Sequence, residues 1–375
     1  MSIRRTAAIL SIAAIAVAAC SGSTASTAPS AAASVAASTA ASAAPSAAPS
    51  TASACKVGTS WFTFQEERYG LRDQPALKAA IEAGGGEYIA NDAKNSAETQ
   101  TTNVENLISQ GVNVLVIDAF DSEAILPSVA AATAAGIPVI AYDRLIEDPS
   151  VLYLTHDNVE VGRMMAREML KSVPKGAYAI IKGDKANPNS LFLSDGFNEI
   201  IGPSVTSGDI KVAAEQFTDS WDPKNAQTEM DQILTGASNK IDAVLSENDG
   251  MAGGVIAALT AQGLDGKVPV TGQDGDAAAL NRVALGTQLV DIWKDSSELG
   301  TAAGKVALQL CKDKDVSKVA GTAPYTTPGG KTVSSILLKP IPITKDNLNV
   351  VLDAKWIDVA TLCKGVTPGS VPACP

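Results

Sequence analysis

The sequence has few of the residues on which much enzyme chemistry depends. Its 375 residues include a single histidine, His156, which excludes a histidine-rich metal site and leaves little room for histidine-based catalysis. None of the five cysteines belongs to a Cys-x-x-Cys pair, which argues against redox catalysis. We therefore expect neither a metal nor a cofactor.

Positive charge is also scarce. The chain carries 29 Lys and Arg against 40 Asp and Glu, a formal net charge of -11. Only Arg4 and Arg5 are basic before residue 55, so the remainder is more acidic still. Such a surface repels a phosphate backbone, which excludes nucleic acid as a partner.

The only long apolar run lies near the start of the chain. Arg4 and Arg5 precede an apolar stretch, Ala7 to Ala19, that Ser11 interrupts. It is too short to span a bilayer and has the form of a secretory signal. It ends in Val17-Ala18-Ala19-Cys20, which resembles the bacterial lipobox, where cleavage precedes a cysteine that becomes lipid-modified. We expect residues 1–20 to be a lipoprotein signal peptide and Cys20 the lipid attachment site; the alternative is an ordinary signal peptide with an incidental cysteine.

Residues 21–54 are nearly all Ala, Ser, Thr and Pro, without a charged residue. This composition cannot bury enough apolar surface to offset the entropy of ordering, so we expect a disordered tether. The protein would then be exported and held at the outer face of the cytoplasmic membrane, or in the periplasm, with the lipid as its only membrane contact.

Export changes the interpretation of the other four cysteines. Outside the cytoplasm an even set is better read as disulfides than as metal ligands. Four cysteines allow three pairings, and the sequence alone does not choose among them. We favour Cys363 with Cys374, which leaves Cys55 with Cys311.

From Lys56 onward, short apolar runs alternate with segments of helical spacing. Continuous apolar runs are typical of parallel strands that are buried on both faces. The alternation predicts an α/β fold with two mostly parallel sheets. The strand candidates are Val57–Ser60, Val114–Ile117, Val139–Ala141, Tyr178–Ile181, Ala243–Leu245 and Val268–Thr271.

Polar side chains follow these strands, where α/β sheets bind their ligands. They are Asp118, Asp143-Arg144, Asp184 with Asn187, Asn248-Asp249 and Gln273-Asp274. A polar loop is the plain alternative for any one cluster. Five clusters favour a polyol, because each hydroxyl both donates and accepts hydrogen bonds. Trp61, Phe62, Phe64 and Trp221 are candidates to stack on a sugar ring, although each could belong to the core.

Several motifs resemble the periplasmic pentose- and hexose-binding proteins. They are Ile-Ala-Tyr-Asp-Arg-Leu-Ile (140–146), Asp-Asn (157–158), Asn-Lys-Ile-Asp-Ala-Val (239–244), Asn-Asp-x-x-Ala-Gly-Gly (248–254), Ala-Gln-Gly-Leu-x-Gly-Lys-Val (261–268) and Thr-Gly-Gln-Asp (271–274). The similarity is greatest to the D-xylose-binding proteins of ABC transporters, followed by the multi-sugar-binding proteins of chemoreception. It extends from about Val57 to Lys355.

The resemblance implies the type I periplasmic-binding-protein fold, with two doubly wound parallel-sheet lobes joined by a three-crossover hinge. The N-terminal lobe would comprise residues 56–158 and 292–337, and the C-terminal lobe residues 159–291 and 338–375. By matching position the sugar-binding residues would be Arg68, Asp143, Arg144, Asn189, Trp221, Asn248, Asp274 and Lys294. Tyr69 stands where Trp is usual, and Lys294 lacks the Pro that normally follows it. Arg144 would offer a planar fork of donors, held by a carboxylate such as Asp143.

The function implied is that of a monomeric, non-enzymatic receptor that delivers a monosaccharide, D-xylose foremost, to an ABC importer permease. A second hypothesis keeps the same pocket, with glucose, galactose or another aldose, and makes a chemoreceptor or sensor the partner. A third is a secreted carbohydrate-active enzyme with paired carboxylates such as Asp249 and Asp274.

Overall fold

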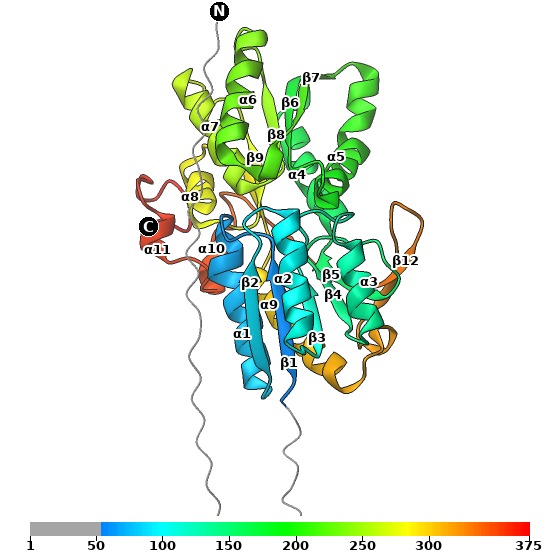
Figure 1. The fold of residues 1–375 in the computed structure, drawn as a ribbon. Coiled ribbons are helices and arrows are strands. Elements are labelled where there is room, and N and C mark those ends of the chain that lie inside the picture. Colours follow the sequence, from blue (N-terminus) through cyan, green and yellow to red (C-terminus); the bar gives the residue numbers. More distant parts are fainter. Residues whose placement is uncertain (1–53) are drawn as a thin grey trace, which may run out of the picture. The chain divides into compact units, whose positions relative to one another are not determined.

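The computed structural model describes residues 54–375 (Figure 1). The predicted signal peptide, Cys20 and all but the last residue of the tether lie outside the described residues. The described part is an α/β structure built on parallel sheets, which confirms the predicted fold class.

The N-terminal lobe is built on a seven-stranded sheet. All neighbouring strands are parallel except the β11–β12 pair. In spatial order the strands are β11 (Ala323–Thr326), β12 (Thr332–Leu338), β5 (Val151–His156), β4 (Val139–Tyr142), β3 (Val114–Ile117), β1 (Lys56–Trp61) and β2 (Glu87–Asp92).

Helices cover both faces of this sheet, which is why its central strands are apolar throughout. In β3, Val114 and Val116 face one hydrophobic cluster, whereas Leu115 and Ile117 face another. The helices of this lobe are η1 (Tyr69–Asp73), α1 (Gln74–Ala83), α2 (Ala97–Ser109), α3 (Leu126–Ala134), α9 (Ser296–Lys312) and η3 (Val316–Lys318).

The C-terminal lobe contains two three-stranded sheets. One has the order β7 (Ile210–Phe217), β6 (Gly176–Lys182) and β8 (Ala243–Ser246), and the other β13 (Ile341–Ile343), β10 (Val290–Trp293) and β9 (Thr271–Gln273). A single bridge between Val244 and Val270 connects them. The predicted strand Val268–Thr271 is therefore placed too early, since β9 begins at Thr271.

The helices of this lobe are α4 (Asn158–Ser172), α5 (Pro188–Ser207), η2 (Asp219–Trp221), α6 (Pro223–Gly236), α7 (Asp249–Ala261), α8 (Ala277–Leu285), α10 (Asn349–Asp353) and α11 (Val359–Leu362). A continuous cluster that includes Met165, Phe197, Met230 and Val255 forms its main core. A smaller cluster, in which Trp293 and Trp356 pack edge to face, lies beneath the C-terminal segment.

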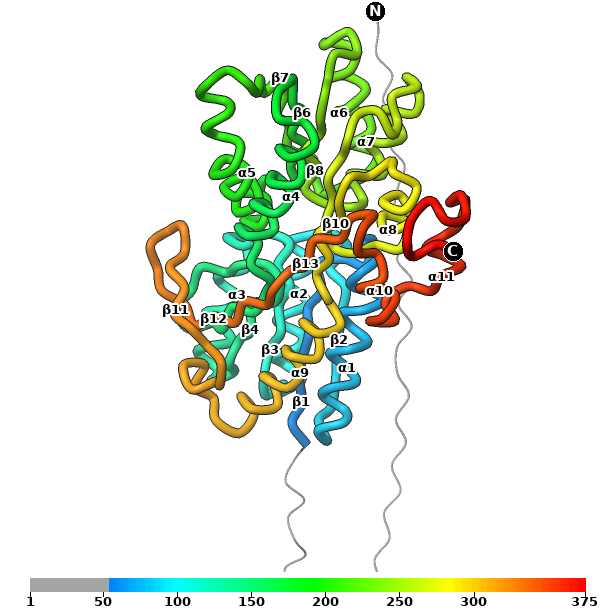
Figure 2. Tube along the Cα trace, turned by 180° about the vertical axis from the view of Figure 1, so that it is seen from behind, coloured from blue at the N-terminus to red at the C-terminus, as the bar shows by residue number. Residues whose placement is uncertain are grey.

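The chain passes between the lobes three times: from β5 into α4, from β10 into α9, and from β12 into β13. Figure 2 shows the third passage from behind. The structure forms both disulfides of the favoured pairing. Cys55–Cys311 joins the start of β1 to the end of α9, and Cys363–Cys374 closes the C-terminal segment.

Candidate functional site

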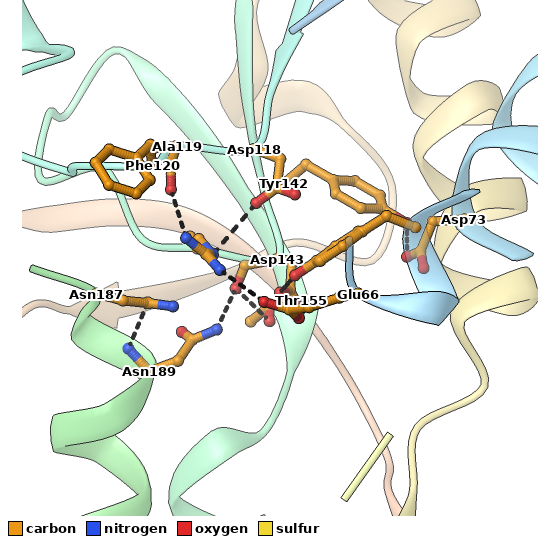
Figure 3. A network of polar contacts seen from close by, with 12 residues as sticks. Glu66, Asp73, Asp118, Ala119, Phe120, Tyr142, Asp143, Thr155, Asn187 and Asn189 are labelled. Carbon is orange, nitrogen blue, oxygen red and sulfur yellow. Dashed lines mark hydrogen bonds and ion pairs between the residues drawn. The ribbon is translucent and has the colours of Figure 1, made fainter. Parts of the chain in front are cut away.

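The carboxyl ends of strands from both lobes meet around one cavity. All eight residues that the sequence predicts as ligands line it, together with Glu66, Tyr69, Asn187 and Gln273. Figure 3 shows Asp118, Asp143 and Glu66 close together, with Asn187 and Asn189 approaching from the N-terminal end of α5. Residues that are distant in the sequence thus form one site.

Arg68 is the central cation of this site. Its guanidinium makes a two-pronged contact with Asp73, with N–O distances of 2.8 and 3.1 Å. The remaining guanidinium nitrogen lies 3.4 Å from a carboxylate oxygen of Asp143 and 3.2 Å from one of Asp274. Asp274 also contacts the ammonium group of Lys294 at 2.8 Å. Because Asp274 belongs to the C-terminal lobe, Arg68 connects the two lobes.

Arg144 has other partners than the sequence suggests. We expected Asp143 to hold it, but Arg144 pairs with Asp118 at 3.5 Å and donates to the carbonyl oxygen of Ala119 at 3.2 Å. Its guanidinium lies 3.4 Å from the ring centroid of Phe62, a cation–π contact. A carboxylate therefore holds Arg144, as expected, but that carboxylate is Asp118 and not Asp143.

Asp143 instead faces Arg68 and accepts a hydrogen bond from the hydroxyl of Tyr69 at 2.9 Å. Burial alone would raise the pKa of Asp143, but the charges of Arg68, Lys294 and Arg144 hold this pKa well below its ordinary value. Asp143 is thus a fixed anion over the working pH range and can only accept hydrogen bonds.

Trp221 lies over Gly183, and the two residues fit each other closely. A β-carbon on Gly183 would lie less than 3.0 Å from three atoms of the indole ring. Trp221 is only 5% exposed and lines both parts of the cleft. Since one face of the ring rests on backbone, the other face is available to a ligand.

The cavity contains polar atoms that the protein itself does not satisfy. Within residues 54–375, three buried atoms of its lining have neither a hydrogen bond nor an ion pair: Oδ1 of Asn189, Nε1 of Trp221 and Oε1 of Gln273. Two more, Oε1 of Glu66 and Nε of Arg144, make no hydrogen bond and lie 3.6 and 3.5 Å from an opposite charge. A buried polar group without a partner costs about 1–3 kcal/mol. Their concentration here indicates a site for a ligand that both donates and accepts hydrogen bonds.

The backbone of the site is strained as well. Asp143, Ser220, Trp221 and Asp274 all have positive φ, at 59°, 57°, 56° and 106°. Such conformations cost a non-glycine residue about 1–3 kcal/mol and cluster where a protein holds a ligand. Asp143 follows β4 and Asp274 follows β9, so each lobe contributes a strained carboxylate at a strand end.

Three of the four predicted stacking residues, Trp61, Phe62 and Phe64, do not line the cavity. Phe62 is buried in the core beneath the guanidinium of Arg144. Trp61 is fully buried in the core, where its indole donates to the hydroxyl of Tyr88 at 3.0 Å. Phe64 packs against Trp61, with ring centroids 6.0 Å apart. The structure therefore corrects all three assignments.

The cleft has an outer part of about 240 Å³ and an inner part of about 10 Å³. The inner part is narrow because Arg68, Asp274 and Lys294 pair directly there. With Glu66 ionised, its lining balances three carboxylates (Glu66, Asp143, Asp274) with three cations (Arg68, Arg144, Lys294), which favours a neutral polar ligand. A larger groove of about 660 Å³, near Lys171 and Lys345, contains none of these residues.

Two further contacts connect the lobes beside the cleft. The amide nitrogen of Asn189 donates to the carbonyl oxygen of Asp143 at 3.2 Å. The guanidinium of Arg72 lies 4.5 Å from the ring of Trp356 and donates to its carbonyl oxygen at 2.6 Å. The Trp356 indole in turn donates to the carbonyl oxygen of Gly275, next to Asp274.

Asp249 and Asp274 are the carboxylate pair that the hypothesis of a carbohydrate-active enzyme requires. Asp249, however, does not line the cavity with Asp274. It accepts hydrogen bonds from the backbone of Gly275 and Asp276 and from the side chain of Gln288. Asp249 therefore holds the loop that carries Asp274.

Comparisons with known proteins show which family shares this architecture. The family model described as "Periplasmic binding protein domain" matches residues 57–315. The D-xylose-binding periplasmic protein of Escherichia coli is 36% identical over 79% of this chain and 89% of its own length. The multiple sugar-binding receptor ChvE of Rhizobium radiobacter is 33% identical over 68% of this chain and 77% of its own.

A solved structure is similar over nearly its whole length. An ABC transporter solute-binding protein from Clostridium phytofermentans, with bound β-D-glucose, is 29% identical with a TM-score of 0.73 and covers 82% of this chain and 99% of its own. Among residues 54–375, no helix has the length and apolar character needed to cross a membrane. The fold, the site at the strand ends and these matches agree that the chain belongs to the periplasmic binding protein family.

Proposed function

We propose that this protein captures a monosaccharide between its two lobes and delivers it to an ABC importer, without catalysis. The observation that carries the proposal is the set of five buried polar atoms without a hydrogen bond, in a cavity lined by three carboxyl groups and three cations. Sugar hydroxyls can satisfy donors and acceptors alike, whereas a charged ligand would disturb the balance. The face of Trp221 that turns away from Gly183 suits the apolar C–H face of a sugar ring.

D-xylose is the sugar that we propose first. The support is the 36% identity with the Escherichia coli D-xylose-binding protein, together with 34% identity over 78% of this chain to its counterpart from Haemophilus influenzae. The eight ligand positions carried over from this resemblance all meet in one cavity. Glucose is the nearest alternative ligand, because a similar solved structure holds it.

Delivery to a permease is proposed from the kinds of relatives that match. We further propose a monomer that is exported, anchored through Cys20, and divided into lobes of residues 56–158 with 292–337 and residues 159–291 with 338–375. Closing and opening at the three crossovers would then trap and release the sugar.

Titration calorimetry of the folded part, residues 55–375, tests the proposal against D-xylose, D-glucose, D-galactose, L-arabinose and D-ribose. We expect one-to-one binding of D-xylose or D-glucose with micromolar affinity or tighter, about -8 kcal/mol or better. The absence of binding across the panel would refute the proposed ligand class.

Two variants locate the binding in the cleft. Asp274→Asn removes a charge that Arg68 and Lys294 share, so we expect binding to be lost, with the fold monitored by circular dichroism. Asp231→Asn removes an equal charge from the exposed face of α6 and should bind like wild type. Equal affinities of the two variants would place the ligand elsewhere.

A further inference from the structure

Among residues 54–375, Glu66 is a carboxyl group of the cleft whose one ion pair is with Arg144. It lies where the inner and outer parts of the cleft meet, and its side chain is 19% exposed. Its Oε1 atom is 3.6 Å from a nitrogen of Arg144 and makes no hydrogen bond. Arg144 is already held by Asp118, the Ala119 carbonyl and Phe62, so positioning Arg144 does not depend on Glu66.

The outer part of the cleft is rich in acceptors and poor in free donors. Five carboxylates line it: Glu66, Glu67, Asp222, Asp274 and Asp276. Its one cation, Arg68, already contacts Asp73, Asp143 and Asp274. A ligand group that reaches the ionised form of Glu66 must therefore be a hydrogen-bond donor, and an anionic group in the outer part would meet more carboxylates than cations.

We propose that Glu66 is a specificity-determining residue of this site, which accepts a hydrogen bond from a sugar hydroxyl facing the mouth and disfavours anionic sugars. The inference rests on the proposed sugar-binding function. It adds a contact that none of the eight positions carried over from the resemblance includes.

The charges around Glu66 make this contact depend on pH. Arg144 and Arg68 face it as cations, and Asp274 and Asp143 as anions. Glu66 in turn acts on Asp118, Asp276 and Tyr69. Burial outweighs the two arginines and raises the pKa of Glu66 to about 7. The ionised fraction should therefore rise from about one tenth at pH 6 to about nine tenths at pH 8.

A charge-assisted hydrogen bond is stronger than a neutral one, so the sugar should select the ionised carboxylate. Affinity for the neutral sugar should then increase by up to about tenfold from pH 6 to pH 8. At pH 7 binding should release about half a proton, measured from the dependence of the calorimetric heat on buffer ionisation enthalpy.

The experiment is titration calorimetry with D-xylose and D-glucose at pH 6, 7 and 8, using wild type, Glu66→Gln and Glu82→Gln. Glu82 is an exposed residue of α1, and its variant serves as the charge-matched control. We expect Glu66→Gln to bind about tenfold more weakly at pH 8 and to lose most of the pH dependence and proton release. The Glu82→Gln variant should retain both.

Other buried acids, such as Asp291 and Glu247, have pKa values raised by burial to about 7 and about 8, but they are present in all three proteins. The difference between wild type and Glu66→Gln therefore isolates Glu66. Sugar binding with the same pH profile in both would overturn the inference and leave the proposed function standing. If neither sugar bound wild type at any pH, both would fall. As a second measure, D-glucuronate should bind wild type more weakly than D-glucose, and an equal affinity would contradict the exclusion of anions.

Discussion

The close contact between Gly183 and Trp221 allows the ligand-facing ring to be displaced by a single methyl group. Gly183 is not among the glycines with positive φ, so alanine is compatible with its backbone and the effect of Gly183→Ala is steric. The new β-carbon would lie less than 3.0 Å from three indole atoms, whereas carbon atoms pack best at about 3.5–4 Å. The ring must therefore retreat from Gly183 and into the cleft.

Two magnitudes follow from this displacement. Overpacking of this kind costs about 1–3 kcal/mol of folding free energy. A misplaced tryptophan at the centre of a binding site costs about 2 kcal/mol or more, which is roughly a thirtyfold loss of affinity. We expect Gly183→Ala to remain folded, with a lower unfolding midpoint, and to bind sugar at least about thirtyfold more weakly.

Calorimetry and thermal unfolding of the variant measure both effects. Gly236→Ala is the matched control, because a β-carbon there meets no atom within 4 Å and the residue ends α6. This control should bind like wild type and unfold at the same temperature or slightly higher. Wild-type affinity in a folded Gly183→Ala protein would show that Trp221 does not stack on the ligand.

Three further predictions concern the lobes and their stability. Arg72→Ala removes the contact between Arg72 and Trp356 that joins the two lobes. Calorimetry should then show several-fold weaker sugar binding by a protein that remains folded. Unchanged affinity would mean that the contact does not favour closure of the lobes. Replacing Cys55 and Cys311 by serine should lower the free energy of unfolding by about 2–5 kcal/mol in denaturant titrations, while sugar affinity stays constant. A variant as stable as wild type would contradict this prediction. Burial raises the pKa of Glu247 to about 8, so the folded state keeps this proton to a higher pH than the unfolded state. The free energy of unfolding should therefore fall as pH rises from about 5 to 8. Glu247→Gln should flatten that slope, and an unchanged slope would refute the assignment.

The sequence was most informative where geometry is set by strand direction. The carboxyl ends of parallel strands meet at one edge of a sheet, so polar residues after apolar runs could be expected to converge. Asp143, Asn248 and Asp274 do so. Gly254 of α7 has a packing reason that only the structure shows, because a β-carbon there would meet the carbonyl oxygen of Pro223 at the start of α6.

Side-chain directions were harder to predict. The predicted first strand ended at Ser60, which placed Trp61 in a ligand-facing loop; β1 continues through Trp61, which faces the same core cluster as Val57 four residues earlier. Asp143 and Arg144 are adjacent in the sequence, but Asp143 has a positive φ, and the two side chains contact different partners: Asp143 contacts Arg68, and Arg144 contacts Asp118. Glu66 lies before the first helical turn, outside any strand, and its sequence neighbourhood carries no periodic signal.

The bond between Cys55 and Cys311 has a mechanical consequence as well. Cys55 lies one residue before β1, which pairs with β2 and β3 inside the sheet. Hydrogen bonds alone would let a pull on the preceding chain peel β1 away from its end, one bond at a time. The disulfide instead passes such a load covalently to α9, which packs along α1. A receptor that is held at a surface by its N-terminal side would therefore resist tension at its attachment point through a covalent bond, while the cleft at the opposite ends of the strands stays free of the load.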